Sequence, residues 1–194
     1  MRAVEPEMPA AVEPSSESMS LSLLAGAVAL SLITSSDSTR TAAARSASRP
    51  AAPAAGDSLV VEKSKRQLVV YYRGEAVRTY YVALGRSPVG DKQRIGDNRT
   101  PEGVFRIEGR NPNSRYHLSL RISYPDSAHR LRAAKLGVAP GGDIMIHGLP
   151  PEQAAFGPAH RDYDWTNGCI AVTNGEIEEL WRVIRDGTPI QIKP

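Results

Sequence analysis

A single cysteine is the residue best suited to nucleophilic chemistry in this 194-residue sequence. Cys169 lies in the segment WTNGCIAVTN, directly after Gly168 and before an apolar run. Gly168 permits a tight turn and a close approach to a ligand, and backbone N–H groups at such a turn can stabilise the oxyanion of a tetrahedral intermediate. A free thiol has a pKa of about 8.5, so it needs a base to react at neutral pH. A buried, inert cysteine is the alternative.

The candidate bases are the four histidines, His117, His129, His147 and His160. His147 is the best of them because it ends an apolar run and precedes Gly148, an arrangement that predicts an imidazole at a sheet edge rather than in the core. His160 lies in a long loop from which it can swing towards the thiol, and it is the reserve base. His117 either lines a cleft or caps a sheet edge, and His129 lies in a polar helix that predicts a solvated side chain. A purely structural histidine is the alternative for His147.

Composition limits both the class of protein and the kind of site. One cysteine excludes an internal disulfide and a cysteine-rich zinc or iron–sulfur site. The histidines lack zinc-motif spacing, so we expect neither a metal nor a cofactor. Charged residues make up 23% and hydrophobic residues 41% of the chain, which is typical of a globular protein. The net charge is +3 and the basic residues are scattered, which argues against a nucleic-acid-binding surface.

Residues 1–56 differ in composition from the rest, because they are rich in Ala, Ser, Pro and Glu while every aromatic residue follows Gly56. Leu21–Ile33 is an uncharged apolar run with the length of a secretory signal, shorter than a bilayer span. Thr34–Gly56 has the composition of a flexible linker. We predict a signal-like segment plus linker over 1–56, a globular domain over 57–194, and export. Cleavage or anchoring of the run stays open, and a disordered tail is the alternative.

The elements that position the candidate residues are mostly strands. Short β-branched and aromatic runs between turn residues predict strands over Ser58–Glu62, Gln67–Tyr72, Ala76–Leu84, Gly103–Glu108, Tyr116–Ser123, Asp143–His147 and Pro189–Ile192. A turn at 111–113 separates two of them. Residues 126–136 predict a helix, and Thr173 and Glu176 have capping-box spacing at the start of a second. The fold class is α+β and mainly β, a sandwich or barrel with a few short helices.

Four segments, taken together, resemble a known family. They are GDNRTPEGVF, NPNSRYHLSL, IMIHGLP and TNGCIAVTN, and they are similar to segments of the L,D-transpeptidase catalytic domain, the YkuD-like family of bacterial peptidoglycan enzymes. The resemblance covers the domain from Ser58 to Pro194. The family pattern is His-Gly followed by Ser/Thr-His-Gly-Cys, which His147-Gly148 and Thr166, Gly168 and Cys169 match.

Two residues depart from that pattern. Asn167 stands where a second His is common, and Ala171 stands where Arg or Asn often follows the cysteine. Together with the long separation between His147 and Cys169 and the DYDW segment before Thr166, these departures resemble the YafK-like branch of the family. That branch implies hydrolysis of peptidoglycan attachments as well as crosslinking.

The resemblance implies a cysteine acyl transferase that acts on peptidoglycan stem peptides in the periplasm or elsewhere in the bacterial cell envelope. Cys169 would be the nucleophile and His147 the base, with the Gly148 carbonyl fixing the His147 tautomer and the N–H groups of Gly168 and Cys169 as oxyanion donors. A hydrolase that trims stem peptides or releases a wall-attached protein, and a non-catalytic peptidoglycan-binding module, are the alternatives. The expected cleft residues are Tyr116, His160, Trp165, Thr166 and Asn167.

Overall fold

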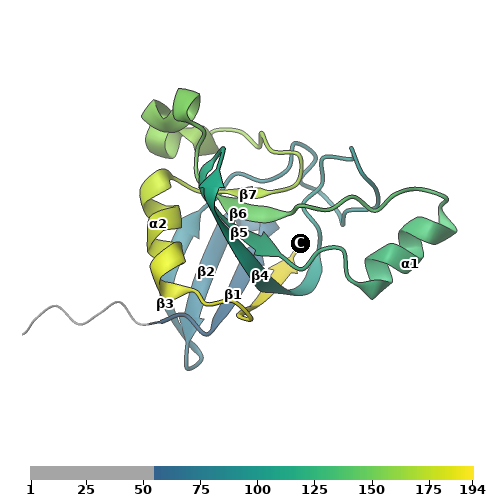
Figure 1. Ribbon diagram of the computed structural model, residues 1–194, viewed down its shortest axis with the longest axis horizontal. Coiled ribbons are helices and arrows are strands. Elements are labelled where there is room, and N and C mark those ends of the chain that lie inside the picture. The colour runs from purple at the N-terminus through teal and green to yellow at the C-terminus, as the bar shows by residue number, and fades with distance from the viewer. Residues whose placement is uncertain (1–54) are drawn as a thin grey trace, which may run out of the picture. The chain divides into compact units, whose positions relative to one another are not determined.

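A computed structural model of the protein describes residues 55–194, which form one curled eight-stranded sheet with short helices around it (Figure 1). The strands are β1 (Ser58–Glu62), β2 (Gln67–Tyr72), β3 (Glu75–Tyr81), β4 (Gly103–Ser114), β5 (His117–Ile122), β6 (Met145–His147), β7 (Ile170–Ala171) and β8 (Pro189–Lys193). The helices are η1 (Lys63–Lys65), α1 (Ser127–Lys135), η2 (Pro151–Arg161) and α2 (Asn174–Val183). The fold is therefore mainly β, which confirms the predicted class.

The strand order is β3-β2-β1-β8-β4-β5-β6-β7. Neighbours are antiparallel except for β1 with β8 and β6 with β7, which run parallel. The chain beyond β3 crosses to the other end of this order, where Ala83 and Ala171 exchange backbone hydrogen bonds of 3.0 and 2.9 Å. Because this bridge joins the two ends of the strand order, the sheet curls around its core and leaves β7 paired on both sides.

Alternating apolar residues of the strands fill the interior, and α2 adds one apolar face to it. Ile177, Leu180 and Ile184 are completely buried in the same core as β1, β5 and β8. The helix begins with the predicted capping box, in which the Thr173 side chain accepts from the Glu176 N–H and Glu176 accepts from the Thr173 N–H. Such a cap satisfies N–H groups that have no partner within the helix, and it fixes where α2 starts relative to β7.

Three local predictions were wrong. The segment 111–113 is not the turn: β4 continues to Ser114, with a register shift between Asn111 and Ser114 that accommodates Pro112 in the strand. The long loop after His147 contains η2, which is kinked at Gly157. Strand β6 is also shorter than predicted because Asp143 has a left-handed backbone with φ of 55°.

The prediction of a solvated His129 was also wrong. The side chain is buried because its position in α1 places the imidazole between two carboxylates. Its Nδ1 lies 2.6 Å from Asp126 Oδ1 and its Nε2 lies 3.2 Å from Asp91 Oδ1. Among the described residues no helix is long and apolar enough to cross a membrane. The predicted signal-like run Leu21–Ile33 lies outside the described residues.

Candidate active site

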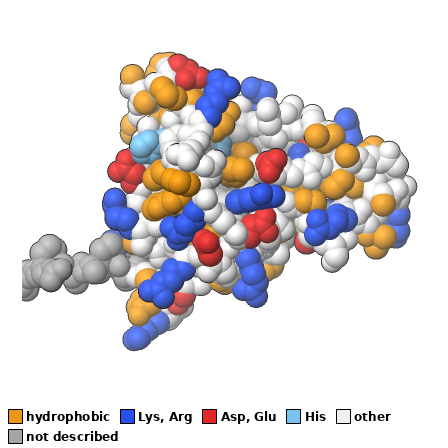
Figure 2. All heavy atoms as spheres, in the orientation of Figure 1, with side chains coloured by type: hydrophobic (Ala, Val, Ile, Leu, Met, Phe, Trp, Pro, Cys, Tyr) orange, Lys and Arg blue, Asp and Glu red, His pale blue; other side chains and the backbone are white. Residues whose placement is uncertain are grey.

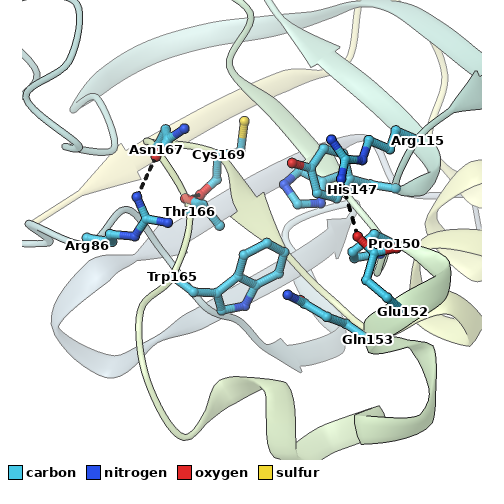
Figure 3. Close-up of a pocket in the computed structure, with 11 residues that line it drawn as sticks. Arg86, Arg115, His147, Pro150, Glu152, Gln153, Trp165, Thr166, Asn167 and Cys169 are labelled. Carbon is cyan, nitrogen blue, oxygen red and sulfur yellow. Dashed lines mark hydrogen bonds and ion pairs between the residues drawn. The ribbon is translucent and has the colours of Figure 1, made fainter.

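Cys169 and His147 line the same pocket, which has a volume of about 240 Å³ (Figure 3). Segments from five parts of the chain meet there: the segment after β3, the turn between β4 and β5, the end of β6, the start of η2 and the turn before β7. The sequence-predicted residues Tyr116, Trp165, Thr166 and Asn167 also line it. The remaining lining residues are Arg86, Arg115, Pro150, Glu152 and Gln153.

The turn that presents Cys169 is held by Thr166. The Thr166 hydroxyl donates to the Cys169 carbonyl oxygen at 2.8 Å and accepts the Gly168 N–H at 3.1 Å. Gly168 has a φ of 130°, and a Cβ at this position would lie only 2.6 Å from the Arg99 carbonyl oxygen. Glycine is therefore required here both for its backbone conformation and for space. The result is a tight turn packed against the 99–100 segment.

The Cys169 side chain is half-buried, and its Sγ donates to the Asp143 carbonyl oxygen at 3.5 Å. Burial raises the pKa of the thiol above its ordinary value, an effect that outweighs the opposing hydrogen bond from the Met145 backbone. Burial acts in this direction because it disfavours the charged thiolate. Cys169 is consequently a neutral thiol at neutral pH in the unliganded site.

The His147 imidazole is buried, with an exposed fraction of 3%. The predicted position at a sheet edge was wrong, because β6 pairs with β5 on one side and with β7 on the other. Its Nδ1–H donates to the Gly148 carbonyl oxygen at 2.7 Å. This bond fixes the tautomer in which Nε2 is the unprotonated nitrogen. Burial lowers the pKa of His147 to about 4, so the ring is neutral at neutral pH.

Gly148 is required by close packing rather than by an unusual backbone angle. A Cβ on it would lie 2.6 Å from Asn174 Oδ1 and 3.0 Å from the Tyr116 carbonyl oxygen. Asn174 Oδ1 in turn accepts the Leu149 N–H at 2.7 Å. The start of α2 and the β4–β5 turn thus both pack against Gly148, and the Gly148 carbonyl orients His147.

Two aromatic rings enclose His147. The Tyr116 ring centroid lies 4.4 Å from that of His147, and the Trp165 centroid lies 5.7 Å from it in an edge-on orientation. His160 packs on the far side of Trp165, with a centroid separation of 6.4 Å, and accepts a long 3.5 Å hydrogen bond from the indole N–H. His160 is buried in η2 and is absent from the pocket lining. Trp165 therefore separates the reserve base from the thiol.

The thiol and the imidazole are not hydrogen-bonded to each other in the described part of the chain, since Sγ is directed at Asp143 and Nδ1 at Gly148. In Figure 3 Cys169 lies between Asn167 and His147, and its sulfur is not turned towards the His147 ring. Rotation of the Cys169 side chain about its Cα–Cβ bond is the movement that would turn the sulfur from the Asp143 carbonyl towards the pocket.

Charged side chains that the sequence analysis did not single out stand on both sides of the pair. Arg86 Nη1 donates to Asn167 Oδ1 at 2.9 Å, and Arg115 Nη2 lies 3.3 Å from Glu152 Oε1 (Figure 3). Arg86 arrives there because Gly85 pairs with Thr166 in an isolated bridge. The sequence signal for Arg115 is its position directly before Tyr116. Residues 55–194 contain no group of three or more His, Cys, Asp or Glu side chains arranged for a metal ion.

Comparison with known proteins gives consistent results. The sequence model of the L,D-transpeptidase catalytic domain (YkuD) matches residues 56–192. The Escherichia coli K12 protein described as "Putative L,D-transpeptidase YafK" is 28% identical over 129 residues, which are 63% of this chain and 44% of that protein. This chain therefore spans less than half the length of that relative.

Solved structures share the fold at lower identity. The helical cell shape determining protein Pgp2 from Campylobacter jejuni aligns over 73% of this chain and 50% of its own, with 24% identity and a TM-score of 0.52. Bdellovibrio bacteriovorus Bd1075 aligns over 72% of this chain and 48% of its own, with 24% identity and a TM-score of 0.51. Since the family's sequence model covers nearly all of the described residues, this chain belongs to the L,D-transpeptidase catalytic domain (YkuD) family.

Proposed function

We propose that this protein is a cysteine acyl transferase that acts on peptidoglycan stem peptides and carries out L,D-transpeptidation through a thioester acyl-enzyme. One observation carries the proposal: a thiol and a neutral imidazole with a fixed tautomer line one pocket. Family membership supplies the substrate class. The same membership supports action in the bacterial cell envelope, in the periplasm or an equivalent compartment outside the cytoplasm.

Acylation begins when the Cys169 thiol turns from the Asp143 carbonyl towards His147. Nε2 takes the thiol proton as the sulfur attacks the stem-peptide carbonyl, and the C–S bond forms while the C–N bond breaks. The imidazolium then gives its proton to the departing amine. Because the pKa of Cys169 is raised and that of His147 is lowered to about 4, a free ion pair is strongly disfavoured. Proton transfer and attack therefore occur together once a carbonyl is bound.

The oxyanion of the tetrahedral intermediate needs N–H donors at the turn. The Gly168 N–H already donates to the Thr166 hydroxyl, so the expectation that Gly168 is an oxyanion donor is not supported. We find no acceptor for the Cys169 N–H within residues 55–194. In our mechanism the Cys169 N–H is the donor, and Thr166 maintains the turn that aims it.

In the second half of the reaction a nucleophile attacks the thioester carbonyl, the C–S bond breaks, and the thiol is regenerated with a proton from His147. An amine acceptor gives a new amide and thus a crosslink or an attached protein. Water gives a shortened stem peptide or a released attachment. The same pair of residues serves both outcomes, so the product identifies the activity.

The test is incubation of the protein with disaccharide tetrapeptide and pentapeptide muropeptides, followed by mass spectrometry of products and of the intact protein. We expect a covalent adduct at Cys169 and crosslinked muropeptides. Cys169→Ala and His147→Ala should abolish both, whereas the matched control His117→Ala, at an exposed residue outside the pocket, should retain them. Trimmed products alone would identify a hydrolase, and binding without an adduct would identify a non-catalytic module.

A further inference from the structure

A second cleft lies beside the first, on the outer face of β4, β5 and β6. Its volume is about 310 Å³, and its lining residues are Glu108, Gly109, Arg110, Asn111, Ser119, Arg121 and Met145. Figure 2 shows acidic and basic side chains next to one another across the middle of the face where Figure 1 places β4 and β5. No residue that lines this cleft has a role in the proposed acylation step.

The strand register places this cleft next to the proposed catalytic pair. Ser119 is directly opposite His147 in the β5–β6 pair, and Arg121 is directly opposite Met145. Residues opposite each other in antiparallel strands project from the same face, with Cβ atoms about 4.5–5.5 Å apart. Ser119 is therefore an immediate neighbour of His147 on the outer face. Asp143 lies two residues before Met145, and its carbonyl oxygen accepts the hydrogen bond from the Cys169 thiol.

The lining contains two arginines, Arg110 and Arg121, and one carboxylate, Glu108, so the net charge of the cleft depends on the carboxylates next to it. Arg121 Nε lies 3.0 Å from Glu108 Oε1, and its Nη2 lies 3.8 Å from Asp143 Oδ1, so one guanidinium serves two carboxylates. The guanidinium of Arg110 is engaged elsewhere, with Asp186 at 3.0 Å and with two carbonyls at the end of α2. Asp143 and Asp186 pair with these arginines from outside the lining, so the group contains three carboxylates and two guanidinium groups. This excess of one negative charge favours a cationic ligand.

The cleft also contains a buried polar group without a partner. Ser119 is 1% exposed, and its hydroxyl has no hydrogen-bond partner in the described part of the chain. A buried hydroxyl with an unused donor and acceptor is unfavourable. A bound ligand with a polar group can satisfy it, so Ser119 marks the place where the ligand chain would contact the sheet.

We propose that this cleft is the acceptor site, in which Glu108 and Asp143 bind the ammonium group of a primary amine and Ser119 bonds to its chain. The inference rests on the proposed function, because it concerns the second half of that reaction. The bound ammonium loses one proton to water, the neutral amine attacks the Cys169 thioester carbonyl, and a C–N bond forms as the C–S bond breaks. One of the two protons on the attacking amine reaches the departing sulfur through His147 Nε2, and the other stays on the nitrogen of the new amide.

The test is the partition of the acyl-enzyme between amine and water, measured as the ratio of the two products by mass spectrometry. The donor is a disaccharide tetrapeptide, the amine is 1,5-diaminopentane, and the full-length protein is used. Both products come from the same acyl-enzyme, so a change in the rate of acylation alters both equally and leaves their ratio unchanged. Glu108→Gln should lower it on the order of tenfold, the effect of losing one charge-assisted hydrogen bond. Glu75→Gln, an exposed carboxylate on β3, is the matched control and should leave it unchanged.

Arg121→Gln distinguishes charge from structure. Removal of the guanidinium frees both carboxylates, so this variant should raise the ratio, whereas general damage to the cleft would lower it in both variants. The proposal is overturned by equal ratios in Glu108→Gln and Glu75→Gln, by a fall in both cleft variants, or by hydrolysis as the only reaction of the wild type. Hydrolysis alone would leave the thioester mechanism intact.

A binding measurement tests the acceptor site independently of the proposed thioester mechanism. Diaminopentane is titrated into Cys169→Ala while amide chemical shifts are recorded, with 1,5-pentanediol as the uncharged control. We expect saturable shifts at Ser119 and Arg121 with the diamine only, and their loss in Cys169→Ala with Glu108→Gln. Absence of such shifts, or equal shifts with the diol, overturns the acceptor site even if no acyl-enzyme ever forms.

Discussion

The burial of two histidines predicts that mild acid destabilises this domain. Burial lowers the pKa of both His147 and His160 to about 4, whereas the ordinary value of histidine is about 6.5. Between pH 6.5 and 4 the unfolded chain therefore binds more protons than the folded one, so stability falls as the pH falls. The stability that depends on the neutral histidines is fully present above their unfolded pKa. It is lost progressively as the pH falls from the unfolded pKa to the folded pKa.

The magnitude follows from 1.36 kcal/mol per pKa unit. At pH 5 each histidine is about 1.5 units below its unfolded pKa, so each lowers the free energy of unfolding by about 2 kcal/mol. At pH 4 the loss is about 3 kcal/mol for each. The two together amount to a large share of the roughly 5–15 kcal/mol that stabilises a typical domain. Carboxylates such as Asp97, with a pKa lowered to about 2, add to the loss only in stronger acid.

Urea unfolding at pH 7.5 and pH 5.0, followed by tryptophan fluorescence, measures this loss. His147→Gln and His160→Gln should each lower the stability at pH 7.5 but reduce the difference between the two pH values by about 2 kcal/mol. His117→Gln is the matched control, because that imidazole is exposed and paired with Glu178. The reasoning fails if the wild type loses no stability by pH 5.0, or if His147→Gln loses as much as the wild type.

Three further predictions concern the turn and its support. The rate of Cys169 alkylation by iodoacetamide should still be rising at pH 9, because burial raises the thiol pKa; a plateau reached near neutral pH would show a preformed thiolate instead. Gly168→Ala should lower the free energy of unfolding by about 2–4 kcal/mol in urea melts, while Gly142→Ala, where a Cβ meets no atom within 4 Å, should change it little; equal effects would contradict the packing argument. Asp164→Ala removes the acceptor of the Leu84 N–H and of the Arg66 guanidinium, so a loss of about 2–4 kcal/mol is expected, and a variant as stable as the wild type would refute it.

Local sequence signals predicted those parts of the fold whose cause is local. The alternating apolar residues of β1 and β2 gave their bounds, and the Thr173–Glu176 capping box gave the start of α2. Each of these elements is determined by residues within a few positions of one another. The composition change at Gly56 predicts where the globular part begins, and this boundary stays a prediction because residues 1–54 lie outside the described structure.

The features that sequence reasoning missed depend on distant partners. His129 is buried because Asp91, which is 38 positions away, lies against it. Arg86 reaches the pocket only because Gly85 pairs with Thr166 across the curled sheet. Pro112 stands inside β4 because a register shift removes the need for its missing N–H. None of these pairings leaves a periodicity or a motif in the sequence, so they can only be found in three dimensions.

The position of β8 in the sheet has a consequence for the time at which the domain folds. β8 is formed by residues 189–193, yet it lies between β1 and β4 and joins the first strands to the rest of the sheet. At about 5–20 residues per second, synthesis of the chain between β1 and β8 takes on the order of ten seconds. During that time β1 lacks one of its two neighbours and the core cannot close. Until β8 has been made, β1 and β4 each keep one hydrogen-bonding edge without its partner strand, so the nascent chain cannot complete the sheet.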